Sequence, residues 1–401
     1  MDFGIDRLPS VAPLVARLRG ARVGLLAHPA SVARSLAHVE QVLAGLGVAP
    51  RVLFGPEHGY GGEAQDMIGV SDARHPVTGA PIVSLYGDDV ASLSPTPEQL
   101  ALADVLVVDL ADVGSRYYTF VWTALLVARA AAAAGVHVVV LDRPNPLGSA
   151  TSDVEGDLPD RRYLSFVGLE PIPVRHGLTL GEIVAFFVAR DGLSLGPDGA
   201  VSVVRSRGDT GASAWSWDRP FVMPSPNMPT LDTALVYPGG CLLEGTNLSE
   251  GRGLTRPFEI VGAPFVDGRA LAVRLLAGGL PGFVARPVTF LPTFQKHARV
   301  ACGGVQIHVT DLRTFRPYAT YLALVGHARA LAGEAFRFRT EKYEFRDDVP
   351  AIDLLTGGDA FRTRLEGGHD VDALARELAR PPAGWADLRA AAVAAADRAA
   401  W

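Results

Sequence analysis

The sequence predicts an α/β protein in which a doubly wound, mostly parallel sheet precedes a smaller C-terminal α+β domain. In the first 145 residues, short continuous runs of apolar and β-branched residues alternate with helical segments. Runs without polar alternation are typical of parallel strands that are buried on both faces. Strands separated by helices at this spacing favour a doubly wound sheet. From about residue 227 the pattern changes to mixed helices and strands, which predicts a second domain of another kind.

The N-terminal elements follow from these runs. Helical periodicity predicts helices over residues 32–46 and 118–134, the second of which ends at Gly135. Thr179 and Glu182 have the spacing of a capping box, which predicts a helix from there to Arg190. Apolar stretches predict strands over residues 22–27, 51–54, 81–86, 104–110, 136–141 and 201–204.

The chain is long enough for two domains. It has 401 residues, whereas a single hydrophobic core stops growing at roughly 250–300 residues. We therefore expect one domain over residues 1–235 and a second over residues 236–401, which would close a cleft against the first. In the second domain we expect strands near residues 284–290 and 303–310 and helices over residues 268–278, 318–332 and from about 384.

Composition excludes several classes of protein. Hydrophobic residues make up 48% and charged residues 20% of the chain, which is typical of a globular protein with a large core. The net charge of −6 gives no electrostatic footprint for nucleic acid. The N-terminus lacks the apolar stretch of a signal peptide, and no run could span a bilayer, so we expect a cytoplasmic protein without a membrane partner. Nothing in the sequence specifies an oligomeric state.

Motifs for metals, cofactors and serine nucleophiles were sought as well. The sequence has no HExxH, EF-hand loop, GxGxxG or P-loop, and Ser115 in Val-Gly-Ser-Arg is poorly suited to a nucleophile elbow, so we expect no metal site, no cofactor and no serine hydrolase. Cys241 and Cys302 lack the spacing of a zinc or redox pair and are interpreted as two inert buried thiols, with one disulfide as the alternative.

A glycine-rich loop carries a dense set of polar residues. A core strand or helix with this composition would bury many unpaired polar groups, so the loop favours a site for a hydroxyl-rich, anionic ligand. The alternative is a hydrogen-bonded loop buried between the domains. The candidate binding residues of this region are Asn227, Glu244, Asn247, Glu250, Arg252 and Arg256.

Polar residues also follow three of the predicted strands. The carboxyl ends of strands in an open α/β sheet are where ligands bind, next to the point at which the strand order reverses. We therefore expect a convergent polar cleft there. The candidates are Glu57 and His58 after the second strand, Asp112, Arg116 and Tyr117 after the fourth, and Asp142, Arg143 and Asn145 after the fifth.

Glu57 is our candidate for the general acid/base. It follows a buried strand, and partial loss of solvent raises a carboxyl pKa towards the range that suits proton donation. The alternative is a carboxylate that caps the next turn. His58 either shares the acid/base work or is structural, and Asp112 either acts as a second catalytic carboxylate or stabilises a turn.

Each of the remaining candidates has two possible interpretations. Arg116 is placed to bind an anion and Tyr117 to stack on a sugar ring, whereas the neighbouring Tyr118 is favoured as a core residue. Asp142 and Arg143 bind ligand or pair with each other. Glu155 and His176 stand beside glycines, where binding and helix entry are equally compatible with the sequence.

Taken together, these motifs resemble the exo-β-N-acetylmuramidase family, a family of glycoside hydrolases that act on peptidoglycan. The matches run in order from about residue 22 to residue 265, with weaker likeness beyond. The strings that carry the resemblance are GPEHGYGG, DLADVGSRYYTF, VVLDRPNPLG, VEGDLP, IPVRHGLTLGE, PSPNMPTLDTALVYPG, LEGTNLSEGRGLTRPFE and GAPF.

The resemblance implies a Rossmann-like lobe that carries the catalytic residue and a smaller lobe that closes over the sugar. It implies release of N-acetylmuramic acid from the non-reducing end of muropeptides or glycan fragments, in cell-wall recycling. Glu57 would be the acid/base, and the lactyl carboxylate of the sugar would suit Arg116, Arg252 or Arg256.

Three points stay open in the sequence. The second catalytic group is Asp112, Asp142, Glu155, Glu244 or the acetamido group of the substrate. A non-catalytic muropeptide-binding protein would use the same cleft. A hydrolase of another N-acetylated amino sugar is the third possibility.

Overall fold

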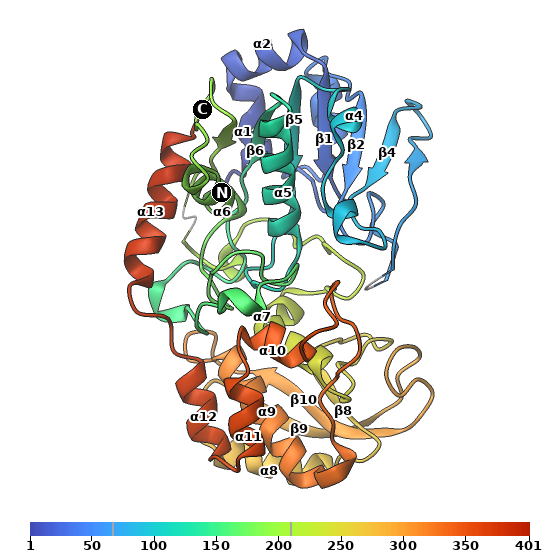
Figure 1. The fold of residues 1–401 in the computed structure, drawn as a ribbon, viewed down its shortest axis with the longest axis vertical. Helices are drawn as coiled ribbons and strands as arrows, with labels where there is room; N and C mark the ends of the chain where they lie inside the picture. The colour runs from blue at the N-terminus through green and yellow to red at the C-terminus, as the bar shows by residue number, and fades with distance from the viewer. Residues whose placement is uncertain (66–67, 209–210) are drawn as a thin grey trace.

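The computed structural model describes residues 1–65, 68–208 and 211–401 and shows two lobes stacked along the long axis (Figure 1). The N-terminal lobe is built on a seven-stranded sheet with strand order β3-β4-β2-β1-β5-β6-β7. All neighbouring strands are parallel except β3 and β4. The strands are β1 Val23–Ala27, β2 Val52–Gly55, β3 Ala73–Arg74, β4 Pro81–Ser84, β5 Val105–Asp109, β6 His137–Leu141 and β7 Val201–Val204. The predicted Rossmann-like, doubly wound fold is confirmed.

Helices cover both faces of this sheet, which is why its strands are apolar on both sides. The helices α2 (Ala12–Gly20) and α3 (Val39–Gly45) pack on one face, where their leucines meet Leu25 and Val107. The helices α5 (Phe120–Ala133) and α6 (Leu180–Arg190) pack on the other face, against Leu26 and Val108. Two short helices, α1 (Gly4–Arg7) and α4 (Pro97–Leu100), complete the lobe.

One predicted helix is shorter than expected. The helix predicted over residues 32–46 begins only at Val39, because the ring of His38 caps its N-terminus by accepting from the backbone N–H of Glu40. The preceding residues form a tight turn with Leu36 at a φ of 64° and a bridge between Val32 and His38. By contrast, the capping box of Thr179 and Glu182 is present at the start of α6, as predicted.

The C-terminal lobe is built on a smaller antiparallel sheet, as predicted. Its strands β8 (Ile260–Ala263), β9 (Phe283–Phe290) and β10 (Cys302–Val309) lie in the order β8-β10-β9. The helices of this lobe are α7 Leu231–Gly240, α8 Gly268–Ala277, α9 Pro317–Ala332, α10 Ala351–Thr356, α11 Ala360–Glu366 and α12 Val371–Leu378. Cys241 and Cys302 are both buried free thiols, so the disulfide alternative was wrong.

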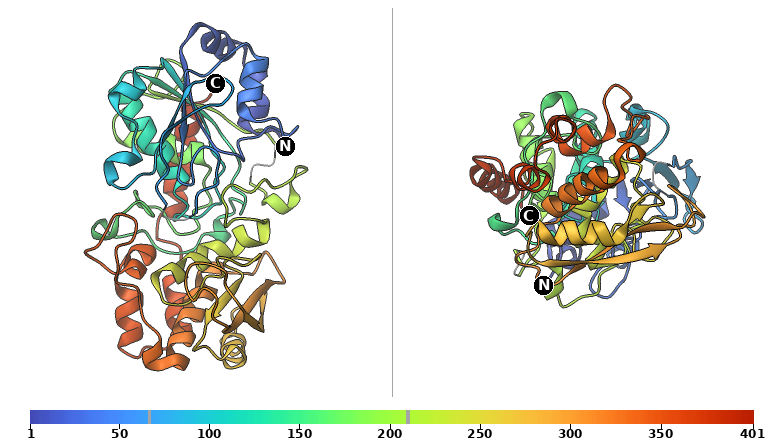
Figure 2. Two further views of the ribbon diagram at one scale, coloured as in Figure 1. Left: turned by 90° about the vertical axis from the view of Figure 1, so that its right-hand side faces the viewer. Right: turned by 90° about the horizontal axis from the view of Figure 1, so that it is seen from below.

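The end of the chain returns to the N-terminal lobe. The last helix, α13 (Trp385–Arg398), packs on α6, and the backbone N–H of Val203 in β7 donates to the carbonyl of Ala399 (Figures 1 and 2). The division of the chain at residues 235 and 236 stays a prediction. Within the described ranges, no helix is both long and apolar enough to cross a membrane.

Candidate functional site

A sharp turn after β2 places Glu57 and His58 at the carboxyl end of the first sheet. The chain folds back so closely that a Cβ on Gly55 would lie 2.3 Å from the backbone nitrogen of Tyr60. His58 adopts a φ of 72°, which is strained for a residue with a side chain. Its ring Nδ1 donates to the carbonyl of Ala64 at 2.9 Å and thereby holds the turn. Strain of this kind clusters at functional sites.

The Glu57 carboxyl is buried, with 6% of its residue surface exposed. Its Oε2 accepts a 2.7 Å hydrogen bond from the hydroxyl of Thr119, the residue that precedes α5. The Thr119 carbonyl in turn accepts from the backbone N–H groups of Trp122 and Thr123 in the first turn of α5. The carboxyl is therefore oriented by a rigid helix end.

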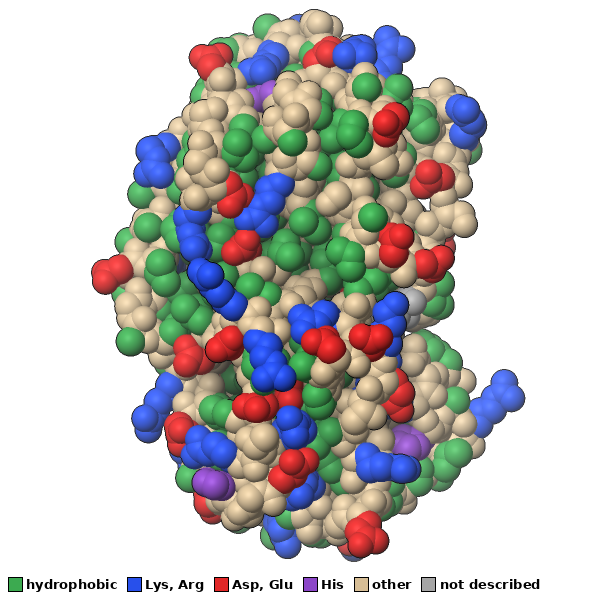
Figure 3. Space-filling model, viewed as in Figure 1, with side chains coloured by type: hydrophobic (Ala, Val, Ile, Leu, Met, Phe, Trp, Pro, Cys, Tyr) green, Lys and Arg blue, Asp and Glu red, His purple; other side chains and the backbone are tan. Residues whose placement is uncertain are grey.

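Glu57 and His58 line a cavity to which both lobes contribute. Its walls enclose about 380 Å³, part of which is open to solvent. From the predicted residues it brings together Glu57, His58, Tyr117, Asn227 and Arg252. The other lining residues are Tyr118, Thr119, Phe120, Ser225, Met228, Tyr237 and Phe258. A space-filling view shows the surface notched between the two lobes at its right-hand edge, with charged side chains gathered along the junction (Figure 3).

Arg252 faces this cavity from the C-terminal lobe and is 4% exposed. Its Nη2 donates to Glu244 at 2.6 Å, and its Nε donates to Glu250 at 3.1 Å. The guanidinium lies 5.3 Å from the ring centre of Phe258. Glu244 and Glu250 do not line the cavity themselves, so their place is behind Arg252, where they orient it.

Both carboxylates behind Arg252 have further partners. The hydroxyl of Tyr343 donates to Glu244 at 2.7 Å, and the ammonium of Lys296 donates to Glu250 at 3.0 Å. Burial alone would raise the pKa of Glu250, but Lys296 and Arg252 outweigh it and hold the pKa below its ordinary value. Glu250 is therefore ionised at neutral pH.

The cavity walls are neutral aromatic groups. Burial raises the pKa of Tyr118 and of Tyr237 well above the ordinary phenol value, so both hydroxyls stay protonated. Asn227 donates through Nδ2 to the side chain of Gln65 at 2.9 Å, which fixes its amide. A cavity of aromatic rings with one carboxyl, one guanidinium and one amide suits a polar ring with an anionic substituent.

Asp112 and Arg143 lie in a second cavity, which we call the switch-point cavity because it adjoins the carboxyl ends of β1 and β5, where the strand order reverses. Its walls enclose about 550 Å³, part of it open to solvent, and they are mainly apolar. Pro224 lines this cavity, and the next residue, Ser225, lines the Glu57 cavity. The sequence expected one polar cleft, whereas the structure has two cavities separated by this segment.

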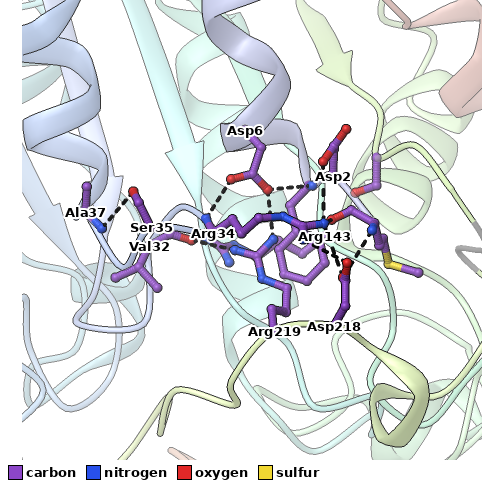
Figure 4. Close-up of polar contacts among 12 residues, drawn as sticks. Asp2, Asp6, Val32, Arg34, Ser35, Ala37, Arg143, Asp218 and Arg219 are labelled. Atoms are coloured by element: carbon purple, nitrogen blue, oxygen red, sulfur yellow. Dashed lines mark hydrogen bonds and ion pairs between the residues drawn. The ribbon is translucent and has the colours of Figure 1, made fainter.

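The two arginines that line the switch-point cavity are each held by a carboxylate, and Figure 4 shows Arg219 with its partner Asp6. Arg143 donates from Nε to Asp109 at 2.6 Å and from Nη2 to the carbonyl of Val32 at 3.1 Å. Arg219 donates from Nη1 to Asp6 at 2.8 Å and from Nη2 to the same carbonyl at 3.4 Å. The predicted alternative in which Asp142 pairs with Arg143 was wrong, because Asp109 takes that position.

Asp112 also lies next to a predicted histidine. Its Oδ2 accepts from the backbone N–H of Gly114 at 2.9 Å and lies 3.6 Å from His176 Nε2. Burial raises the pKa of Asp112 to about 7 and lowers that of His176 to about 3. Both groups are therefore neutral over part of the physiological range, in agreement with a distance too long for a strong ion pair.

Four further predicted residues form hydrogen bonds inside the protein that stabilise the fold. Arg116 donates to the carbonyls of Asp157, Ile172 and Leu355. Asn145 donates to the carbonyl of Leu178. Asp142 accepts from Thr179 and Gly181, and Glu155 accepts from the backbone N–H groups of Tyr318 and Ala319 at the start of α9. Burial raises the pKa of Asp142 to about 6 and that of Glu155 to about 7.

Asn247 and Arg256 also lie away from the Glu57 cavity. Asn247 donates to the carbonyl of Ala335 and accepts from the backbone N–H of Arg337. Arg256 has a 41% exposed side chain and pairs with Asp232 and Glu259. The structure thus does not bring these two residues to the carboxyl of Glu57.

Several residues that build the cavity were not predicted. Thr119 directly follows the Tyr117 motif, so its position after a predicted strand end was an available signal. Tyr118 was favoured as core, which the structure confirms, and it also lines the cavity. Tyr237 and Phe258 are separated in the sequence from every other lining motif of the first lobe, and no local pattern distinguishes them from core aromatics.

Comparison with known proteins places the whole chain in one group. Family models described as "Exo-beta-N-acetylmuramidase NamZ" match residues 23–232 with the N-terminal domain and residues 235–393 with the C-terminal domain. The chain is 39% identical over 382 residues to the peptidoglycan beta-N-acetylmuramidase NamZ of Bacillus subtilis (strain 168), covering 93% of this chain and 86% of the relative.

Two crystal structures from Bacteroides fragilis NCTC 9343, both of DUF1343 family proteins, have the same fold. The first has a TM-score of 0.83 at 28% identity and covers 98% of this chain and 97% of that chain. The second has a TM-score of 0.71 at 25% identity and covers 98% of both.

Proposed function

The chain belongs to the exo-beta-N-acetylmuramidase NamZ family, and we propose that it is a glycosidase that releases N-acetylmuramic acid from the non-reducing end of peptidoglycan fragments. One observation carries the assignment of its site: the buried carboxyl of Glu57 shares a cavity with the guanidinium of Arg252. The first is the group that glycoside cleavage needs, and the second is the group that an acidic sugar needs.

Glu57 is the proton donor in this proposal. Its carboxyl protonates the glycosidic oxygen as the bond from that oxygen to the anomeric carbon breaks, and the leaving sugar departs as an alcohol. Water then supplies the new hydroxyl at the anomeric carbon, and the proton it loses restores the carboxyl. Thr119 orients the group, because its hydroxyl donates to Oε2.

Arg252 is the group that recognises muramic acid. The sugar differs from N-acetylglucosamine by its lactyl ether, which carries a carboxylate. A guanidinium that is already fixed by Glu244 and Glu250 loses little conformational entropy when it binds that carboxylate. Tyr117, Tyr118 and Phe258 supply ring surfaces for the apolar faces of the sugar.

The second catalytic group is proposed from the same lining. Among the described residues, Asp112, Asp142, Glu155 and Glu244 are not on the cavity wall that carries Glu57. Of the candidates expected from the sequence, this placement favours the acetamido group of the substrate as the nucleophile that captures the oxocarbenium-like centre. Retention of configuration at the anomeric carbon is the expected outcome.

The direct test is hydrolysis of 4-nitrophenyl β-N-acetylmuramide, compared with the matching N-acetylglucosaminide. We expect release of nitrophenol from the muramide and a far smaller rate with the glucosaminide. Binding of a muramyl disaccharide without product would instead assign a binding protein, and equal rates on both glycosides would assign a less selective amino-sugar hydrolase. The cytoplasmic location expected from the sequence stays a prediction, which cell fractionation tests.

A further inference from the structure

A second polar groove lies in the C-terminal lobe, outside the Glu57 cavity. Its walls enclose about 1120 Å³, much of it open to solvent, which is enough for more than one sugar. The lining combines amides, hydroxyls and cationic groups with one aromatic ring. We call it the basic groove and define it by Thr246, Asn247, Gln295, Lys296, His297, Arg337, Phe338, Arg339, Thr340 and Glu341.

Cationic groups outnumber anionic groups in this lining. The lining holds Lys296, Arg337 and Arg339 but a single carboxylate, Glu341, which is 77% exposed and 4.0 Å from the guanidinium of Arg339. The ammonium of Lys296 is paired with Glu250 behind the groove. Within the described part of the chain, the guanidinium of Arg337 makes no hydrogen bond or ion pair, and its charge acts at longer range on Glu341. An exposed arginine with its donors unused, beside amides and hydroxyls, is the composition expected for recognition of an acidic, hydroxyl-rich chain.

The loop that forms one wall of the groove is held in an unfavourable conformation. Gln295, His297 and Arg299 all have positive φ values, of 64°, 57° and 62°. A residue with a side chain is strained in this region and persists there only when its surroundings enforce it. Here the ring of His297 is bound to the carbonyl of Asn247 at 2.7 Å. Lys296 donates to the carbonyls of Leu243 and Leu248.

The opposite wall is fastened to the same residue. The side chain of Asn247 donates to the carbonyl of Ala335 and accepts from the backbone N–H of Arg337. Asn247 therefore ties the strained loop on one side to the arginine segment on the other. This placement gives a role to a motif residue that the Glu57 cavity does not use.

The groove is connected to the Glu57 cavity through one carboxylate. Glu250 accepts from Arg252, which lines the cavity, and from Lys296, which lines the groove, at 3.1 and 3.0 Å. The two sites are therefore back to back across a single buried ion-pair chain. Across this short separation, a ligand longer than one sugar is long enough to reach from the cavity to the groove.

We propose that the basic groove binds a second carboxylate of the same substrate, beyond the terminal muramic acid. This inference rests on the proposed function, because it takes the substrate to be an acidic glycan fragment. Two parts of such a fragment can supply this carboxylate. One is the lactyl group of the next muramic acid, and the other is a stem peptide, whose own carboxylates replace the lactyl carboxylate that its amide bond uses. Arg337 is the residue that binds this carboxylate.

The experiment compares three ligands in a Glu57→Gln background, so that binding is measured without turnover. The ligands are the peptide-free disaccharide of N-acetylmuramic acid and N-acetylglucosamine, the corresponding tetrasaccharide, and the disaccharide with its stem peptide. Into this background we introduce Arg337→Glu. The matched control is Arg274→Glu on α8, which makes the same charge change at another exposed arginine of the C-terminal lobe.

We expect Arg337→Glu to raise the Kd of the tetrasaccharide or of the peptide-bearing disaccharide by about 2–5-fold, on the usual scale of exposed charge pairs. The Kd of the plain disaccharide and the behaviour of the control should stay the same. A change for the tetrasaccharide assigns the lactyl group, and a change for the peptide-bearing ligand assigns the stem peptide. If Arg337→Glu and its parent bind each ligand with the same Kd, the proposed role of the basic groove is wrong.

The test of the basic groove and the test of the proposed function can fail independently of each other. If the wild-type protein fails to hydrolyse any muramide, the proposed function fails, whereas the binding comparison still reports on the groove. If hydrolysis is normal but charge reversal at residue 337 leaves every Kd unchanged, only the groove is lost. Circular dichroism of Arg337→Glu checks that the exposed substitution leaves the fold intact.

Discussion

The Glu57 cavity and the switch-point cavity are neighbours at the same end of the first sheet, yet they use buried charge in opposite ways. In the switch-point cavity, Arg143 and Arg219 are paired with Asp109 and Asp6 from the same lobe. In the Glu57 cavity, the carboxyl comes from one lobe and the guanidinium of Arg252 from the other. The pairs of the switch-point cavity hold one lobe together. Arg252 is also held by carboxylates of its own lobe, but it faces a carboxyl of the other lobe, so both groups are available to a ligand that lies between the lobes.

The two buried arginines show the difference most clearly. Arg143 and Arg252 are 7% and 4% exposed, and each is bound to carboxylate oxygen at 2.6 Å. Behind Arg252, however, the carboxylates are already satisfied by Tyr343 and Lys296. This support keeps the guanidinium in place without consuming all of its capacity to bind an anion. Burial and pairing alone therefore do not identify a ligand-binding arginine.

The largest expected effect is at Glu57. Glu57→Gln should lower kcat on the chromogenic muramide by about 100-fold or more, because the amide cannot donate the proton to the leaving oxygen. The matched control is Glu259→Gln, since Glu259 is also buried and also accepts a 2.7 Å hydrogen bond from a threonine. Asp112→Asn should show a much smaller fall than Glu57→Gln. If kcat falls equally in both variants, Asp112 also takes part in catalysis and the two cavities act as one site.

The arginine pair gives the next largest effect. Arg252→Ala should raise KM for the muramide by about 10–100-fold and leave KM for the glucosaminide nearly unchanged, since a charge-assisted bond to carboxylate contributes about 1.5–3 kcal/mol. Arg143→Ala should instead lower the free energy of unfolding by about 3–5 kcal/mol, because Asp109 is left buried and unpaired. Kinetics and urea unfolding of both variants test the contrast. A selective loss of muramide binding in Arg143→Ala would contradict it.

A further expected effect concerns the pH dependence of stability. Burial raises the pKa of Asp112 to about 7 in the folded protein, above its ordinary value of 3.8. Its contribution to stability is therefore complete below about pH 4 and is lost as the pH rises through 7, by about 4 kcal/mol at most. Asp112→Asn should flatten the fall in stability between pH 5 and pH 7.5, as urea unfolding would show. An unchanged slope would mean that the group titrates normally.

Stability depends on pH in the opposite direction at Glu250, which lies behind the Glu57 cavity. The pKa of Glu250 lies below its ordinary value of 4.5, so its contribution is present above that pH and is lost as the pH falls. Glu250→Gln should therefore change stability at neutral pH and converge with the wild type in acid. The two carboxylates separate the two cavities by the direction of their pH dependence.

Local patterns were enough to predict most of the fold. Continuous apolar runs identified six of the strands of the first sheet, because a strand buried on both faces has no polar alternation. They did not reveal the edge strand β3, whose two residues are exposed, or the helix α7, which contains Pro238 and two glycines. The start of α3 was missed because a histidine ring, which is not a common cap, ends the preceding turn.

Residue types and turn positions in the chain were sufficient to identify Glu57, His58, Asn227 and Arg252 as candidates for one site, since their chemistry and their glycine-rich surroundings are local properties. Which arginine faces the ligand could not be read in this way. Arg116, Arg143 and Arg252 look alike in sequence, and their partners lie between 2 and 239 residues away. The packing of the two lobes decides whether those partners are backbone carbonyls, a neighbouring aspartate or a pair of glutamates. The type of partner distinguishes an arginine that stabilises the fold from one that can bind a ligand.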